Sequence, residues 1–187
     1  MDFALGPEQQ MFQDQIRRFA QAELAEGAVA RAHAQGYPWQ VAHRIAGMGL
    51  MGIALPEADG GQGGSLVDAI LAIQAVAEIC PRSGDVVQSG NFGPIRTFAE
   101  FATAEQKARF LPDLLAGRAV ISLGMTEPEA GSAVTELATS AVADGEDFIV
   151  NGTKIFGTHS AEANVFLVYV RFGPGVGGIG SVLIERG

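Results

Sequence analysis

The chain has 187 residues, of which 48% are hydrophobic and 18% are charged, and its formal net charge at pH 7 is −9. This hydrophobic content excludes an intrinsically disordered chain, because it is high enough to form a buried core. Lys107 and Lys154 are the only lysines. The sequence therefore argues against a nucleic-acid binder, which needs a surface that neutralises phosphates.

The cellular setting is predicted from the apolar runs and the cysteine count. No run approaches the roughly 18 apolar residues that a membrane span needs, and no basic stretch precedes an apolar one at the N-terminus, so no signal peptide is predicted. Cys80 is the only cysteine, which makes an intrachain disulfide impossible and is typical of a reducing compartment. We therefore expect a cytoplasmic protein with no membrane span.

Residues 1–117 show the spacing of helices. Pro7 suits the first turn of a helix, where its missing N–H is not needed, and apolar residues recur at helical spacing from there to Leu24. The best-defined helix follows Thr103, which forms a capping box with Gln106. Further helices are predicted over residues 39–50, 65–77 and 83–101.

The pattern changes to short strands after Gly117. An Asp-Gly pair at residues 144–145 separates two short apolar runs and predicts a hairpin, and Asn151-Gly152 predicts another two-residue turn. Helices followed by antiparallel strands favour an α+β fold. Strands are expected over residues 119–125, 140–142, 148–150, 165–172 and 181–185, with a glycine-rich link over residues 173–180.

Several short motifs do not carry a function. Residues 175–180 fit the letters of G-x-G-x-x-G, but a strand follows them instead of the helix that would bind a pyrophosphate, so a hairpin loop is expected. The glycines of residues 60–64 lack the lysine and hydroxyl of a phosphate-binding loop. His33, His43 and His159 do not have the spacing of metal ligands, so no metal site is predicted. No G-x-S-x-G sequence supports a hydrolase.

Two segments remain, about 20 residues apart. Residues 121–132 read Ile-Ser-Leu-Gly-Met-Thr-Glu-Pro-Glu-Ala-Gly-Ser, and residues 150–158 read Val-Asn-Gly-Thr-Lys-Ile-Phe-Gly-Thr. Each alone is also explained by a structural hairpin. Together they resemble the acyl-CoA dehydrogenase family, whose pattern is T-E-P-x-A-G-S followed by N-G-x-K-x-aromatic-x-T. Residues 49–64 and 105–117 are similar to the family as well, so the resemblance covers essentially the whole chain.

The resemblance implies an N-terminal helical domain over residues 1–117 and an incomplete, antiparallel, β-barrel-like middle domain over residues 118–187 that faces flavin and CoA. Family members bind FAD and oxidise the α,β bond of an acyl-CoA thioester in lipid or fatty-acid metabolism. An electron-transferring flavoprotein as acceptor and a homo- or hetero-oligomer are implied too. The family's catalytic glutamate lies in a C-terminal bundle that is not among these residues. We therefore nominate no catalytic base and expect the isolated chain to be inactive.

The resemblance also implies a set of binding residues. Thr126 and nearby N–H groups suit the flavin edge that gains negative charge on reduction. Phe156 matches the aromatic residue that packs against the ring, and Thr158 matches a hydroxyl residue near the hydride-accepting atom. Ser132 matches a residue that contacts CoA. The residues implied to contact the cofactor are Leu123, Met125, Thr126, Phe156 and Thr158.

Some positions depart from the family pattern. Glu129 stands where the family has glycine, Ala133 where it has aspartate, and His159-Ser160 replaces Asn-Gly or Asn-Ala. Because these changes flank the CoA and flavin edges, the alternative is a non-catalytic or degenerate subunit that supports an active acyl-CoA dehydrogenase partner. A small α+β domain without a ligand is a third reading. Glu127 is expected to be structural and Glu129 to face solvent.

Overall fold

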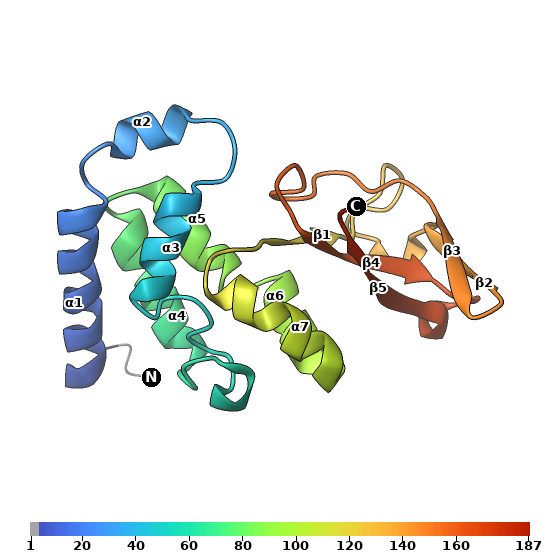
Figure 1. Ribbon diagram of the computed structural model, residues 1–187, viewed down its shortest axis with the longest axis horizontal. Coiled ribbons are helices and arrows are strands. Elements are labelled where there is room, and N and C mark those ends of the chain that lie inside the picture. The colour runs from blue at the N-terminus through green and yellow to red at the C-terminus, as the bar shows by residue number, and fades with distance from the viewer. Residues whose placement is uncertain (1–3) are drawn as a thin grey trace. The chain divides into compact units, whose positions relative to one another are not determined.

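The computed structural model describes residues 4–187, which divide into a helical unit that ends at Ala119 and a sheet unit over Val120–Gly187 (Figure 1). The helical unit contains α1 (Pro7–Glu23), α2 (Ala28–His33), α3 (Trp39–Gly47), η1 (Glu57–Asp59), α4 (Leu66–Ala77), α5 (Pro81–Ser89), α6 (Pro94–Phe101) and α7 (Ala104–Leu115). The sheet unit contains β1 (Ile121–Gly124), η2 (Val134–Glu136), β2 (Ser140–Asp144), β3 (Asp147–Asn151), β4 (Val165–Arg171), η3 (Val176–Gly178) and β5 (Ile179–Glu185).

Local caps define the starts of two helices, one of which, at Thr103, is the capping box that the sequence predicts. At the start of α4, the Asp68 amide donates to the Ser65 hydroxyl at 3.1 Å, and the Ser65 amide donates to the Asp68 carboxylate at 2.9 Å. The same reciprocal pair joins Thr103 and Gln106 at the start of α7, at 3.2 and 2.9 Å. Each capping box satisfies N–H groups that have no partner inside the helix. Both predicted helix starts are confirmed.

The single helix predicted over residues 83–101 is wrong, because two helices, α5 and α6, occupy this stretch. Gly93 interrupts the chain with a φ of 67°, and Pro94 then starts α6. The buried Asn91 side chain also occupies the break, where it accepts from the Ile53 amide at 2.6 Å. This tertiary partner is invisible in the local pattern and outweighs the helical periodicity.

Two smaller differences concern the edges of the helical unit. The helix predicted over residues 39–50 ends earlier, at Gly47. The short α2 was not predicted, and its sequence lacks a clear signal because none of its side chains is buried. Amphipathic spacing identifies a helix through its buried face, so a helix without one leaves no periodic pattern.

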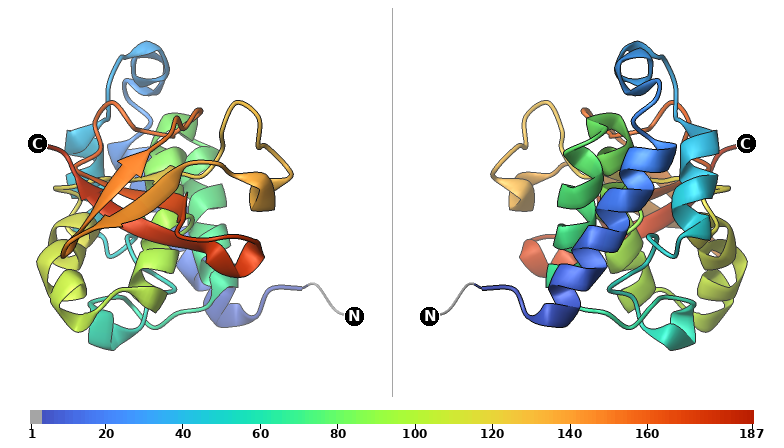
Figure 2. Two further views of the ribbon diagram at one scale, coloured as in Figure 1. Left: turned by 90° about the vertical axis from the view of Figure 1, so that its right-hand side faces the viewer. Right: turned by 90° about the vertical axis from the view of Figure 1, so that its left-hand side faces the viewer.

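The core of the helical unit forms where α1, α3, α4 and α5 pack side by side (Figures 1 and 2). Leu24, Ile45, Leu55 and Phe98 are fully buried in this unit. Each such side chain contributes about 1.5–3 kcal/mol by leaving water. Among residues 4–187, none of the helices combines the length and apolar character required to cross a membrane.

The sheet is mixed and open, which corrects the expected antiparallel, barrel-like arrangement. Its order is β1-β4-β2-β3, and β5 also pairs with β4. The hairpins β2–β3 and β4–β5 are antiparallel, but β4 pairs in parallel with β1 and, at one position, with β2. Strands joined by a tight turn must be antiparallel, whereas β1 and β4 are linked by a long connection that imposes no such constraint. The α+β class itself is confirmed.

One predicted turn is confirmed and the other is wrong. The turn at Gly145 connects β2 to β3. At Asn151-Gly152 the chain leaves β3 and does not enter another strand until Val165. Gly152 is required there for close packing, because a Cβ atom on it would lie 2.6 Å from the Thr139 Cα atom. A glycine that permits close approach looks the same in sequence as one that permits a turn.

Candidate functional site

The two segments singled out in the sequence lie side by side in the sheet unit. The Ile155 amide donates to the Thr126 carbonyl at 2.9 Å, and the Ser122 hydroxyl donates to the Thr158 carbonyl at 2.8 Å. Residues 154–158 therefore run along β1 and the residues that follow it. The structure brings five of the six predicted site residues to this edge.

The six residues differ in exposure. Leu123 in β1 and Met125 and Thr126 directly after it are half-buried, while Thr158 is exposed. Ser132 is also exposed, on the loop that follows a short bridge between Glu127 and Ala130, and the described contacts do not join it to the other five. The predicted CoA contact thus stands apart from the predicted flavin edge.

Phe156 is the most unusual residue of this edge. Its side chain is 87% exposed and its φ is 60°. His159, with a φ of 58°, is the only other non-glycine residue with positive φ among residues 4–187. A left-handed conformation costs an ordinary residue about 1–2 kcal/mol, and an exposed ring gains little packing energy in return. Strain of this kind concentrates at functional sites.

Two glycines allow the segments to approach closely. A Cβ atom on Gly157 would lie 3.4 Å from the Ser122 hydroxyl oxygen. One on the buried Gly124 would lie 3.4 Å from the Lys154 Cγ atom. Both distances lie at the short end of ordinary van der Waals contact, so the two segments pack directly against each other at Gly124 and Gly157.

A buried ion pair links this edge to the next loop. The Lys154 ammonium lies 2.7 Å from Glu127 Oε1 and donates to the Met125 carbonyl at 3.0 Å. The Glu127 carboxylate also accepts from the amides of Ala138 and Thr139, at 2.6 and 2.9 Å. Burial by itself would raise the pKa of Glu127, but the two amides and the ammonium outweigh it and lower the pKa to about 2.

The carboxylates near the site match their expected roles. Glu127 is structural, since three donors occupy it, and Glu129 is exposed. Sequence reasoning gave no role to Lys154. A usable signal was present, because a lysine placed directly before Ile-Phe sits in an apolar setting and buried lysines are almost always paired.

The chemistry available at this edge is that of binding and orientation. It offers an exposed aromatic face from Phe156, hydroxyls from Thr126 and Thr158, and backbone N–H groups beside β1. Within residues 4–187, no three histidine, cysteine or acidic side chains lie together as metal ligands would. The edge therefore suits a planar aromatic group with polar ring atoms.

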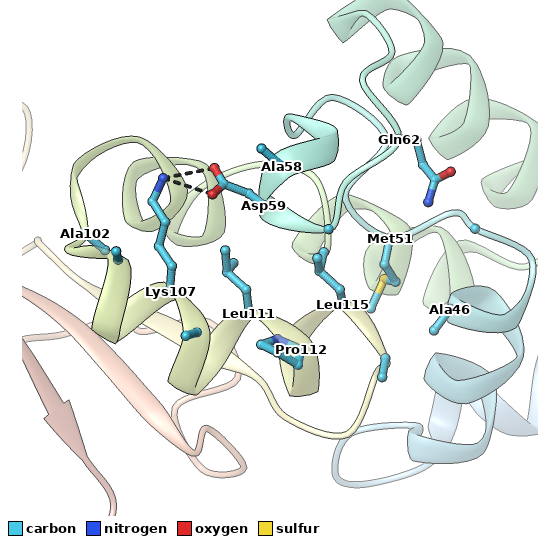
Figure 3. A pocket seen from close by; sticks show the side chains of 15 residues that line it. Ala46, Met51, Ala58, Asp59, Gln62, Ala102, Lys107, Leu111, Pro112 and Leu115 are labelled. Carbon is cyan, nitrogen blue, oxygen red and sulfur yellow. Dashed lines mark hydrogen bonds and ion pairs between the residues drawn. The ribbon is translucent and has the colours of Figure 1, made fainter.

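A separate cavity of about 800 Å³ lies wholly within the helical unit (Figure 3). At one end the Lys107 ammonium binds both carboxylate oxygens of Asp59, at 2.9 and 3.1 Å. Met51, Leu111 and Leu115 line the rest, together with several alanines and glycines. None of the six predicted site residues lines this cavity.

Comparison with known proteins gives a consistent result along the chain. Residues 6–118 match the family model described as the acyl-CoA dehydrogenase N-terminal domain, and residues 122–187 match the model of the acyl-CoA dehydrogenase middle domain. A short-chain-specific acyl-CoA dehydrogenase of Clostridium acetobutylicum is 30% identical over 189 aligned residues, which cover 100% of this chain and 50% of that protein. The chain spans about half the length of the curated relatives it matches.

Solved structures are similar over the same extent. A chain in a structure of the electron-transferring flavoprotein of Acidaminococcus fermentans, from work on flavin-based electron bifurcation, superposes with a TM-score of 0.88 at 32% identity. The match covers 100% of this chain and 50% of that one. Glutaryl-CoA dehydrogenase of Mycobacterium smegmatis in complex with FADH2 gives a TM-score of 0.87 at 26% identity, over 97% of this chain and 46% of that one.

Proposed function

The chain belongs to the acyl-CoA dehydrogenase family, and we propose that it supplies the FAD-binding edge of a flavoprotein that oxidises the α,β bond of an acyl-CoA thioester. The relatives support this proposal, since their names describe enzymes that act on CoA thioesters and the structure of one of them is a complex with FADH2. The substrate's chain length and branching are left open by the proposal. The proposal includes a cytoplasmic location, which is expected from the single cysteine.

The observation that carries the proposal is Phe156, an aromatic side chain held exposed by a left-handed backbone. The residues around it fit an isoalloxazine ring, which has a flat aromatic face and a polar edge. Stacking on the face contributes about 0.5–1.5 kcal/mol beyond area burial. The Thr126 and Thr158 hydroxyls would bind the polar edge, and Leu123 and Met125 would cover it.

When bound, FAD supplies the chemistry of hydride transfer, and the residues of this chain bind and orient it. Donors at Thr126 would be fixed in advance where negative charge develops, so they need no rearrangement during the reaction. Ser132 would contact the CoA moiety from its exposed loop. The proposed acceptor is an electron-transferring flavoprotein, in a homo- or hetero-oligomer, and a similar chain in the Acidaminococcus fermentans structure supports that pairing.

The proposal assigns no catalytic base to these residues. Glu127 is occupied by the Lys154 ammonium and two backbone amides, so its carboxylate is not available to accept a proton from substrate. Glu129 is exposed on the adjacent turn. We place the base in a further polypeptide segment or in a partner chain. The isolated chain should then bind FAD without dehydrogenating any acyl-CoA.

Titration of the purified chain with FAD, followed by flavin fluorescence and visible absorption, tests the proposal. Phe156→Ala should weaken FAD binding several-fold, in line with the stacking energy. Phe101→Ala is the matched control, since Phe101 is also exposed, at 75%, but lies in the helical unit. Phe156→Gly should weaken FAD binding by the same factor as Phe156→Ala. It should not lower the stability of the chain, because glycine adopts the left-handed conformation without strain. A wild-type chain that stays colourless after reconstitution and gel filtration would contradict the proposal.

A second candidate is the non-catalytic subunit that supports an active partner. The exposed positions Glu129 and Ala133 favour it, because they change the loop beside Ser132 where the family has glycine and aspartate. Flavin content of the purified complex separates the two functions. Near one FAD per chain supports the dehydrogenase role, and a complex in which only the partner carries flavin supports the subunit role.

A further inference from the structure

A lysine-centred network holds the residues on both sides of Thr126. The Lys154 ammonium donates to the Met125 carbonyl at 3.0 Å and lies 2.7 Å from Glu127 Oε1. The amide of Ile155 donates to the Thr126 carbonyl at 2.9 Å. Lys154 and Ile155, which directly precede the exposed Phe156, therefore bind three successive residues, Met125, Thr126 and Glu127.

The network is fixed on its far side as well. The Glu127 carboxylate accepts from the amides of Ala138 and Thr139, at 2.6 and 2.9 Å. The side chains of Lys154 and Glu127 are only 14% and 7% exposed. A buried ion pair is stable only when its remaining donors and acceptors are satisfied. Lys154 therefore belongs to a rigid frame and is unlike a freely rotating surface lysine.

We propose that Lys154 is a positioning residue for the flavin edge, which holds Thr126 and the strained Phe156 in the arrangement that binds FAD. The inference rests on the proposed function above. A left-handed phenylalanine persists only where its surroundings fix the backbone, and Lys154 lies two residues before it. The lysine acts through Thr126 and Phe156, since its own ammonium is engaged by Met125 and Glu127.

A direct electrostatic role for Lys154 makes a different prediction. If its positive charge stabilised the reduced flavin, neutralising the Glu127 carboxylate would expose that charge and raise the flavin reduction potential. If Lys154 acts by position, loosening the pair from either side misplaces the Thr126 donors. Both Lys154→Met and Glu127→Gln should then lower the potential, because misplaced donors stabilise the reduced flavin less.

The binding experiment compares the FAD affinity of the wild-type chain with that of four variants. The reduction potential of the bound flavin is measured separately, in Lys154→Met and Glu127→Gln. Lys154→Met should bind FAD about tenfold more weakly, the size of effect seen when groups that orient ligand-binding residues are removed. It should also shift the visible absorption band of the bound flavin. Lys154→Arg should restore most of the affinity and the band position. Lys107→Met is the matched control, since it removes the chain's other paired lysine. Val170→Ala is the stability control, because it shortens a fully buried side chain that packs with Ala141 and Val168 in the sheet core and makes none of the hydrogen bonds around Lys154 and Glu127.

Hydrogen exchange without FAD gives an independent readout. Lys154→Met should speed exchange at the amides of Ile155, Ala138 and Thr139 more than Val170→Ala does at equal overall stability.

The inference is overturned if Lys154→Met matches the wild-type chain in FAD affinity and spectrum, if Val170→Ala weakens FAD binding as much, or if Glu127→Gln raises the potential. A wild-type chain that binds no FAD overturns the proposed function, and the inference with it.

Discussion

Each unit of the molecule contains one lysine bound to one carboxylate, and the two pairs differ in what surrounds them. Lys107 binds Asp59 through both carboxylate oxygens, with side chains 24% and 16% exposed, and joins α7 to η1. The pair of Lys154 and Glu127 is more buried and also binds two backbone amides.

The difference follows from how each unit satisfies its backbone. Helices bind their own N–H and C=O groups, and caps at Ser65 and Thr103 provide for the first turn. In the connection before β2, the amides of Ala138 and Thr139 donate to the Glu127 carboxylate and not to a backbone carbonyl, so a side chain here takes the place of an internal backbone partner. The pair of Lys107 and Asp59 therefore adds to a unit whose backbone groups already have hydrogen-bond partners. Glu127, in contrast, supplies the acceptor that two backbone amides would otherwise lack.

The largest expected effect is that of Glu127→Ala, which should lower the free energy of unfolding by about 3–5 kcal/mol, because it leaves a buried ammonium and two amides without their acceptor. Hydrogen exchange of β4 peptides would report the loss in the sheet unit, while the fluorescence of Trp39 reports the helical unit. Glu129→Ala, in the same turn but exposed, should stay within about 0.5 kcal/mol. Equal effects of the two variants would refute the role assigned to Glu127.

Acid should weaken the sheet unit through the same carboxylate. The pKa of Glu127 is about 2 in the folded chain and 4.5 as its ordinary value. A lowered pKa stabilises the fold fully above the ordinary value, and the contribution is lost as the pH falls from about 4.5 toward 2. The loss is on the order of 3 kcal/mol. Unfolding curves across this range should show it in the wild-type chain, and Glu127→Gln should flatten that part of the profile.

Close packing against the same loop gives the next effect. Gly152→Ala should cost about 1–3 kcal/mol, because the added carbon would lie 2.6 Å from the Thr139 Cα atom. Gly131→Ala is the control, since a Cβ atom there meets nothing within 4 Å. Urea midpoints measured by exchange in the sheet unit would compare them. A tolerated Gly152→Ala would mean that Asn151-Gly152 is a flexible turn after all.

What the sequence predicts well lies close together along the chain. The reciprocal pair of Thr103 and Gln106 spans three residues, so the letters alone predict it. The parallel pairing of β1 with β4 joins residues far apart in sequence, and no local pattern specifies it.

The candidate site shows the same division. Its membership follows from the resemblance of two segments to one family, and the structure places five of the six residues on one edge. Their mutual support through Lys154 and Glu127 was not predictable, because the partners come from different segments and the lysine's acceptors include a backbone carbonyl. Gly152 was misread for a related reason, since its neighbour Thr139 is defined only by the tertiary fold.

The smallest effect belongs to the pair in the helical unit. Lys107→Met should lower the free energy of unfolding by about 1 kcal/mol or less, since the pair is partly exposed, its methionine replacement can pack against Leu111 in the cavity (Figure 3), and no backbone amide depends on it. Trp39 fluorescence during urea unfolding measures this, with Lys107→Arg as the charge-conserving control. A loss as large as that of Glu127→Ala would show that the bidentate contact with Asp59 holds η1 against α7. The difference in burial and in backbone partners between the two pairs would then produce no difference in stability, and the comparison would fail.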